Sequence, residues 1–192
     1  MKVLMINGSP NANAVVFTAL SAVAATLKEE GIESEIYQIG KDDDGLTVAQ
    51  ASKEILEKME SADGLIIGAP DYFGSPSGKL LSIMDKAFLT GAPFVYKPAA
   101  SVAAGRRAGI TPVLDVINKY YNMTNMPVVP GNYYNTVHGN TAAEVEQDLE
   151  GMQTMRALGR NMAWMLKCIE AGKKSGVALP EQEKKIKFSI IR

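Results

Sequence analysis

The feature that most constrains this chain is its first stretch, where an apolar segment runs into a small polar loop and then into a helical pattern. Residues 2–6 (KVLMI) predict a buried strand, and residues 7–13 (NGSPNAN) predict a tight loop. From residue 14 the apolar spacing becomes helical and continues to residue 30. A loop between a strand and a helix N-terminus presents free backbone N–H groups and the positive end of the helix dipole, so this stretch predicts an anion site.

The composition of this first loop limits which kind of anion it could bind. The loop contains neither GxGxxG nor GxxxxGK[ST], which argues against a dinucleotide fingerprint and against a nucleoside triphosphatase loop. Ser9, Asn11 and Asn13 offer neutral donors, which suit one phosphate monoester. The alternative is an ordinary strand-to-helix turn that binds nothing.

Length and charge limit the class of protein. The 192 residues predict one domain at 1–171, followed by a basic tail at 172–192 with an apolar end. The net charge of −1, with no basic block, argues against a nucleic-acid partner. The N-terminus does not resemble a signal peptide, and no stretch is apolar enough to span a membrane, so we expect a cytoplasmic protein.

Strand and helix patterns alternate along the whole chain. This alternation, with right-handed crossovers and helices on both faces, predicts a doubly wound five-stranded parallel sheet of order 2-1-3-4-5. Strands are expected at 2–6, 33–39, 64–69, 99–104 and 126–129, and helices at 14–30, 48–61, from Ser77 to about 88, 111–121 and 141–171.

Two further loops follow strand ends and face the same crevice. The loop at 70–78 holds two adjacent aromatic residues, Tyr72 and Phe73, which predict either a platform for a flat ligand or packing in a core or interface. The loop at 105–109 places a glycine before Arg106 and Arg107. In the predicted strand order these loops meet the first loop where strands one and three part, which is where ligands bind in such sheets.

An aspartate cluster and a single histidine could suggest a metal site and a catalytic residue, but we favour neither interpretation. Asp42, Asp43 and Asp44 lack the spacing of a calcium loop, so a solvated loop is the better interpretation and no metal site is predicted. The single histidine, His138, lies in a predicted loop, where a structural or solvated role is more common than a catalytic one.

The chain resembles the NADPH-dependent FMN reductases of flavodoxin-like fold, near their iron–sulfur flavoprotein branch. The resemblance covers nearly the whole chain, and its strength lies in the order and spacing of several moderately specific stretches. These stretches are 8–11 (GSPN), 68–73 (GAPDYF), 103–109 (AAGRRAG), 118–121 (NKYY), 126–129 (MPVV), 133–139 (YYNTVHG) and 158–164 (LGRNMAW).

The resemblance implies FMN held without a covalent bond, reduced by NADPH or NADH, and a homodimer or homotetramer. It implies that the first loop binds the phosphate, that the second lies along the isoalloxazine, and that the third borders the pyrimidine end, where positive charge stabilises reduced flavin. No side chain need act as an acid or base. The implied cofactor-binding residues are Ser9, Asn11, Asn13, Pro70, Asp71, Tyr72, Phe73, Gly74, Ser75, Ala104, Gly105, Arg106 and Arg107.

The sequence departs from the family in two places. Close relatives often carry a threonine in the phosphate segment, whereas residues 14–16 (AVV) offer no hydroxyl. One lost hydrogen bond to a charged group weakens FMN binding by about tenfold to a hundredfold. The second departure is the absence of a cysteine cluster after strand two. With Cys168 as the only cysteine, the chain cannot supply the ligands of an all-cysteine iron–sulfur site or an internal disulfide.

These features predict an FMN-dependent NAD(P)H oxidoreductase. Its acceptor would be a small molecule or ion: a quinone, a free flavin, an azo or nitro compound, or a metal ion. Two alternatives stay open, a flavodoxin-type electron carrier and a regulatory or scaffold relative that has lost the flavin. Flavodoxins tend to be strongly acidic, so the near-neutral charge and the two arginines favour the enzyme.

Overall fold

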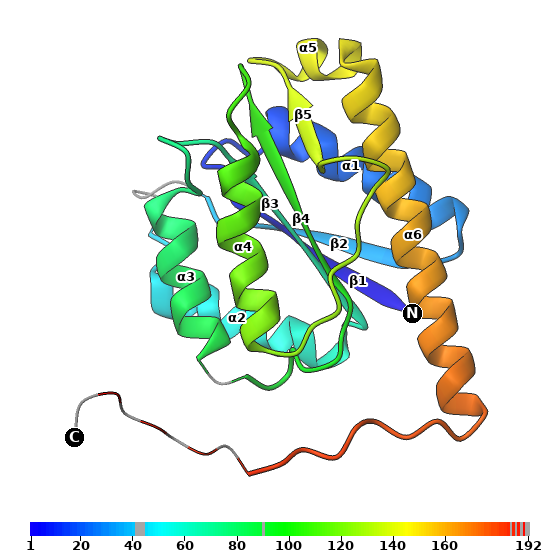
Figure 1. Ribbon diagram of the computed structural model, residues 1–192. Coiled ribbons are helices and arrows are strands. Elements are labelled where there is room, and N and C mark those ends of the chain that lie inside the picture. The colour runs from blue at the N-terminus through cyan, green and yellow to red at the C-terminus, as the bar shows by residue number, and fades with distance from the viewer. Residues whose placement is uncertain (41–44, 90, 185, 187, 189, 191–192) are drawn as a thin grey trace.

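Five parallel strands form one sheet in the order β2-β1-β3-β4-β5 (Figure 1). The structure is a computed structural model and describes residues 1–40, 45–89, 91–184, 186, 188 and 190. The strands are β1 (Lys2–Asn7), β2 (Glu33–Gln38), β3 (Gly64–Pro70), β4 (Ala99–Gly105) and β5 (Thr136–His138). The helices are α1 (Val15–Glu29), α2 (Val48–Ser61), α3 (Gly78–Phe88), α4 (Thr111–Met123), α5 (Ala142–Gln147) and α6 (Leu149–Lys174).

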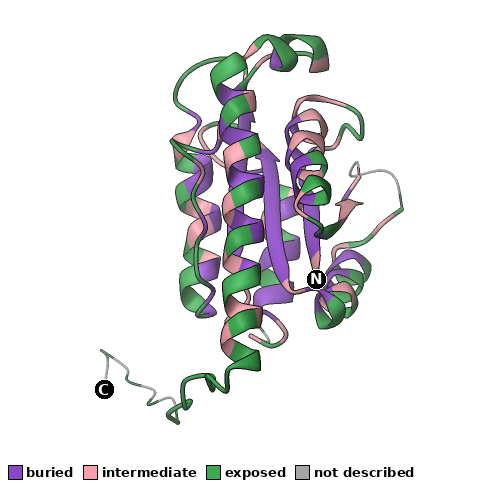
Figure 2. Ribbon diagram, turned by 90° about the vertical axis from the view of Figure 1, so that its right-hand side faces the viewer, coloured by how far each residue is buried: buried purple, intermediate pink, exposed green. Residues whose placement is uncertain are grey.

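Helices cover both faces of the sheet and create two apolar cores. Helices α1 and α6 pack together on one face, and α2, α3 and α4 cover the other (Figures 1 and 2). The central strand β3 supplies both cores, because Ile66 packs toward α1 and α6 while Ile67 packs toward the opposite helices. Its almost wholly apolar sequence is what a parallel strand buried on both faces requires. The predicted fold class and strand order are confirmed.

The predicted fifth strand is wrong in position, although a fifth strand exists. Residues 126–129 make only an isolated bridge, in which the N–H of Val129 donates to the carbonyl oxygen of Ala99 at 2.8 Å. Pro127 and Pro130 have no N–H to donate, so this segment cannot continue a ladder. Strand β5 lies further along the chain and pairs with residues 103–105 of β4.

The helix predicted at 141–171 is two helices. The Thr141 hydroxyl accepts from the N–H of Glu144 at 3.2 Å and starts α5, as the predicted cap requires. The chain then turns at Asp148, whose carboxylate accepts from the N–H of Gly151 at 2.9 Å and caps α6. An aspartate competes well for backbone donors, so it ends one helix and begins the next.

Helix α6 ends at Lys174, and the described residues of the tail beyond it are exposed (Figure 2). The aspartates at 42–44 lie outside the described residues. Among the described residues, no helix combines the length and apolarity needed to cross a membrane.

Candidate functional site

The loops that follow β1, β3 and β4 meet at the carboxyl edge of the sheet. The N–H of Gly8, after β1, donates to the carbonyl oxygen of Gly68 in β3 at 2.8 Å. The N–H of Asp71, after β3, donates to the carbonyl oxygen of Ala104 in β4 at 2.9 Å. The three loops singled out in the sequence are therefore adjacent, as predicted.

Side-chain amides fix the shape of the first loop. The side-chain oxygen Oδ1 of Asn7 accepts from the backbone N–H of Ser9 at 3.1 Å. The side-chain nitrogen of Asn7 donates to Gln38 Oε1 at 2.6 Å. The Gln38 amide in turn donates to the carbonyl oxygen of Ser9 at 2.6 Å. Sequence reasoning missed Asn7 and Gln38; a buried asparagine at the end of an apolar strand was the available signal.

Ser9 lies inside this network and is only 4% exposed. Its hydroxyl oxygen accepts from the N–H of Asn11 at 3.1 Å, which leaves the hydroxyl proton able to donate to a ligand. Asn11 and Asn13 are exposed. Of the three predicted phosphate donors, Ser9 is held by the loop and the two asparagines face outward.

Helix α1 begins without a side-chain cap. Its N-cap residue, Ala14, makes no capping hydrogen bond, and the N–H groups of Val15, Val16 and Phe17 have no acceptor among the described residues. Unpaired N–H groups at a helix N-terminus are a favourable place for a negatively charged group. The missing cap is thus consistent with an external anion completing this end of the helix.

At positions 14–16, where relatives often carry a threonine hydroxyl, this chain has apolar side chains. Val16 is buried and packs against β3, where a Cβ placed on Gly68 would lie 2.8 Å from Val16 Cγ1. The nearest threonine, Thr18, donates its hydroxyl to the carbonyl oxygen of Ala14 at 3.2 Å. No hydroxyl of the first turn of α1 therefore replaces the one that relatives often carry.

The second loop forms a narrow turn. The N–H of Tyr72 donates to the carbonyl oxygen of Ser75 at 2.9 Å, and the reverse bond measures 3.2 Å. Phe73 (φ 57°) and Gly74 (φ 73°) are both left-handed, which is the geometry of a type I′ turn. Tyr72 is 44% exposed, and Phe73 is fully exposed at the tip. Neither ring packs in the core of this chain, so the platform and interface readings remain.

The third loop carries unpaired positive charge. Arg106 and Arg107 are exposed, and neither makes a hydrogen bond or ion pair with a described residue. Gly105 is required at the start of this loop, because a Cβ there would lie 2.4 Å from Ile110 Cγ2. Two free guanidinium groups beside the crevice favour an anionic ligand or transition state.

One carboxylate at this edge lacks a hydrogen-bond partner. Oδ1 of Asp71 is buried and unpaired, and it is the only such side-chain atom in the described part of the chain. A buried acceptor without a donor is unusual in a native protein and calls for a specific explanation.

The histidine is structural in this arrangement. His138 pairs with Gly105 in the sheet, and its N–H donates to Asp148 Oδ2 at 2.8 Å. The same carboxylate oxygen lies 3.4 Å from the imidazole Nδ1. Asp148 thus ties β5 to the start of α6 while it caps that helix.

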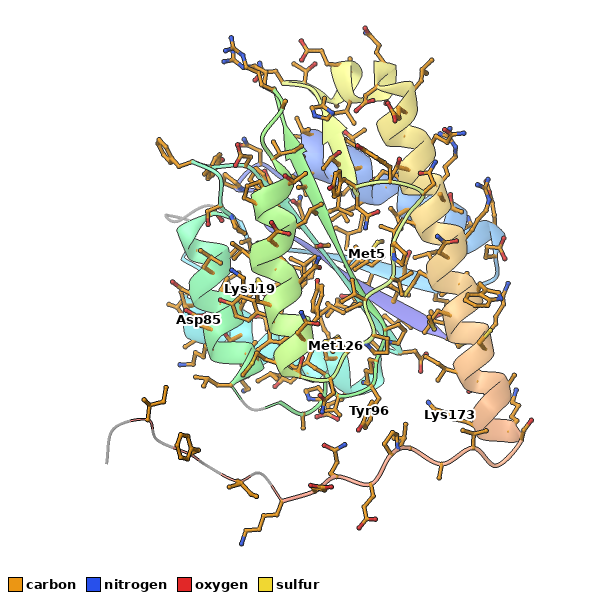
Figure 3. All side chains as sticks on the ribbon, in the orientation of Figure 1. Met5, Asp85, Tyr96, Lys119, Met126 and Lys173 are labelled. Carbon is orange, nitrogen blue, oxygen red and sulfur yellow. The ribbon has the colours of Figure 1, made fainter. Side chains whose placement is uncertain are left out.

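A groove also lies away from these loops, between α3 and α4. It has a volume of about 720 Å³, and its lining is mostly apolar. Asp85 and Lys119 mark the two helices that bound it (Figure 3). Within it the Tyr120 hydroxyl donates to Asp85, and burial together with this bond raises the pKa of Tyr120 to about 12. The groove is far from the three loops in the fold and holds none of the predicted site residues.

The three loops match the chemistry of FMN. The unpaired N–H groups of α1 and the Ser9 hydroxyl suit a phosphate, the exposed aromatic turn suits a flat ring, and the unpaired Asp71 oxygen suits a ligand donor. The residues present therefore fit the group. No cluster of three or more histidine, cysteine, aspartate or glutamate residues that could hold a metal occurs in the described ranges.

Comparison with known proteins agrees with this fit. A family model described as NADPH-dependent FMN reductase matches residues 1–141. An iron–sulfur flavoprotein of Methanocaldococcus jannaschii is 31% identical over 196 residues, covering 88% of this chain and 100% of that protein. An NADPH azoreductase of a Bacillus species is 29% identical over 119 residues, covering 57% of this chain and 63% of that protein.

Solved structures share the architecture. The apo form of an NADH:FMN oxidoreductase matches with a TM-score of 0.68 and 19% identity, covering 85% of this chain and 89% of that one. A structure described as a flavone reductase matches with a TM-score of 0.70 and 20% identity, covering 88% of this chain and 64% of that one. At these identities the structural match bears on the fold alone.

Proposed function

The chain belongs to the family of NADPH-dependent FMN reductases, and on this basis we propose that it carries reducing equivalents from a nicotinamide cofactor through FMN to a small-molecule acceptor. The candidate acceptors are a quinone, a free flavin, an azo or nitro compound, or a metal ion. The observation that carries the proposal is the meeting of an uncapped helix N-terminus, an aromatic turn and two unpaired arginines at one edge of the sheet.

The residues of the first loop are proposed to bind and orient. The N–H groups at the start of α1 and the Ser9 hydroxyl would hold the phosphate, while Asn7 keeps the loop in place. The exposed amides of Asn11 and Asn13 would add donors once an anion is present. All of these donors belong to the first loop and the start of α1, so the proposed phosphate binding needs no metal.

The second and third loops are proposed to surround the reacting ring. FMN itself supplies the hydride chemistry when bound. Residues 70–75 would lie along the ring, with the turn at Phe73 offering an apolar face that excludes water from one side. Gly105, Arg106 and Arg107 would border the end of the ring that gains negative charge on reduction.

We also propose that the protein acts as a homodimer or homotetramer. At the groove between α3 and α4, Leu89 and Met123 are 85% and 77% exposed, so two large apolar side chains lie in solvent on one face. A second copy of the chain would cover such a face in a closed symmetric assembly.

The test is to bind FMN and then to supply electrons. Purified protein is stripped of flavin and titrated with FMN by calorimetry, and the loaded protein is mixed with NADPH or NADH and with menadione as the acceptor. We expect saturable FMN binding and menadione-dependent oxidation of NADPH. Binding without nicotinamide oxidation would identify an electron carrier instead, and no binding at high micromolar FMN would identify a flavin-free relative.

A further inference from the structure

The buried, unpaired oxygen of Asp71 is unexplained by the packing of the chain. Asp71 directly follows β3, and its own N–H is taken by the carbonyl oxygen of Ala104. The side-chain oxygen Oδ1 is shielded from water and receives no donor from any described residue. An acceptor in this state loses its hydrogen bonds to water and gains nothing in return.

Three backbone donors near this oxygen are already engaged elsewhere. The N–H groups of Tyr72 and Ser75 bond to each other's carbonyl oxygens across the turn, and the N–H of Gly139 bonds to Gly105 at 3.1 Å. The side chains of Arg106 and Arg107 carry free donors, but both are exposed and neither bonds to this oxygen. None of these groups donates to Asp71 Oδ1, which leaves the oxygen available to a ligand donor.

Asp71 lies at the junction of the second and third loops. A Cβ placed on Gly105 would lie 3.6 Å from Asp71 Cβ, so the two loops come within van der Waals contact at this point. The residue as a whole is only half-buried, and the last torsion of an aspartate is broad, so the carboxylate can reorient when a ligand binds.

We propose that Asp71 is a positioning residue whose carboxylate accepts a hydrogen bond from a donor of the bound flavin, either the N–H of its pyrimidine ring or a hydroxyl of its ribityl chain. The inference rests on the proposed function and assigns the side chain a role in holding the ring at a fixed angle. It also explains why an unfavourable buried acceptor is retained: the chain is incomplete at this point until the ligand arrives.

The test compares Asp71→Leu and Asp71→Asn with the parent protein, in flavin-free form. Leucine removes the acceptor at similar volume, whereas asparagine keeps one acceptor oxygen. We expect FMN affinity to fall about tenfold to a hundredfold in Asp71→Leu and less in Asp71→Asn. We expect the flavin-free Asp71→Leu protein to unfold at the same or a higher temperature than the parent, because the unpaired acceptor is gone. Asp115→Leu, at an exposed position of α4, is the matched control.

Two analogues identify the donor. Lumiflavin has the ring but no ribityl chain, and N3-methyl lumiflavin also lacks the ring N–H. A loss seen with lumiflavin and abolished by methylation assigns the ring N–H, and a loss confined to ribityl-bearing flavins assigns a hydroxyl. Unchanged FMN affinity in Asp71→Leu, equal losses in the two variants, or marked destabilisation of both flavin-free variants would overturn the inference. If the parent itself does not bind FMN, the proposed function fails first, and the failure is seen before any variant is compared.

Discussion

The hydroxyl of Ser77, at the start of α3, donates a 3.3 Å hydrogen bond to the carbonyl oxygen of Gly8, in the loop after β1. The same oxygen atom of Ser77 accepts from the N–H of Leu80 at 3.4 Å and so caps the helix. One side chain thus joins two of the three loops at the candidate site and begins the helix that follows. Gly8 of the first loop is therefore bonded both to Gly68 in β3 and to Ser77 at the start of α3.

Replacing Ser77 with alanine should lower both stability and ligand affinity. The lost cap should reduce the free energy of unfolding by about 1 kcal/mol, measured by urea denaturation. The freed loop should weaken FMN binding severalfold, because ordering it then falls to the ligand. Ser82→Ala, at an exposed position of α3, serves as the control. An affinity for FMN equal to the parent's would show that the Ser77–Gly8 bond does not shape the site.

Replacing Ser9 with alanine should discriminate between phosphorylated and unphosphorylated flavin. Its hydroxyl is held by the N–H of Asn11, so its proton is available to an anion. A hydrogen bond to a charged group contributes about 1.5–3 kcal/mol, so FMN affinity should fall about tenfold to a hundredfold. Riboflavin lacks the phosphate and should be much less affected. Equal losses for the two ligands, measured by calorimetry, would place Ser9 away from the phosphate.

Low pH should weaken the ion pairs by which Glu35 of β2 joins Lys2 of β1 and Lys58 of α2. Glu35 Oε2 lies 2.6 Å from Lys2 Nζ, and its Oε1 lies 2.5 Å from Lys58 Nζ. The hydrogen bonds from these two lysines hold the pKa of Glu35 below its usual value of 4.5. A carboxylate with a lowered pKa stabilises the fold at pH values above its unfolded pKa, and the stabilisation is lost as the pH falls through the folded pKa.

The variant Glu35→Gln should therefore be less stable than the parent by about 1 kcal/mol at pH 7, since the three side chains are about a third exposed and solvent screens them. The difference should stay constant between pH 7 and pH 5 and shrink below pH 4.5. Urea denaturation at pH 7, 5 and 3 measures it, with Glu33→Gln in the same strand as an exposed control. A difference that persists unchanged at pH 3 would assign the effect to something other than these ion pairs.

The apolar groove should be an interface between copies of the chain. The parent should scatter light as a particle heavier than the 20.6 kDa of one chain. Met123→Glu places a charge on the exposed rim of the groove and should shift the protein toward monomer while circular dichroism stays unchanged. Leu149→Glu makes the same change at an equally exposed residue of α6. A 20.6 kDa particle for the parent at micromolar concentration would refute the assembly.

The sequence was sufficient for the order of the sheet because the decisive strands are strongly patterned. Strands β1, β3 and β4 are apolar runs bounded by glycine and proline, and the right-handed crossover rule leaves few ways to arrange them. The fifth strand was misplaced because the MPVV segment has the composition of a strand, but it contains Pro127 and is followed by Pro130, and neither proline has an N–H group. Its real position, at 136–138, is only three residues long, too short for a periodic signal.

The site was predicted to the level of loops and not of individual contacts. Spacing places 7–13, 70–75 and 105–109 at one edge, but it does not show that Asn7 and Gln38 hold the first loop together. The two bonds of Gln38 join residues about thirty positions apart, and only the folded sheet brings them close. The break at Asp148 was also missed, although its cause is local, since the carboxylate caps α6 at Gly151, three residues further on.

The arginines of the third loop should tune the reduction potential of the flavin. Both guanidinium groups are exposed and make no ion pair with a described residue, so their charge is not neutralised within the described chain. A flavin ring beside them would exclude water on one side and strengthen their effect beyond that of a surface pair. Arg106→Gln and Arg107→Gln keep a side chain with hydrogen-bonding groups and remove the charge. Each should lower the two-electron potential and slow reduction by NADPH, with less effect on FMN affinity.

Potentiometric titration of each loaded variant measures this shift directly. For a two-electron couple a change of about 30 mV corresponds to about 1.4 kcal/mol of differential stabilisation, so a single screened charge should move the potential by tens of millivolts or less. Arg156→Gln, at an exposed position of α6 outside the three loops, should leave the potential unchanged. If both loop variants match the parent within error, the arginines do not tune the flavin. A raised KM for NADPH with an unchanged potential would instead assign them to the phosphate of the nicotinamide cofactor, and a lighter particle in light scattering would assign them to a subunit contact.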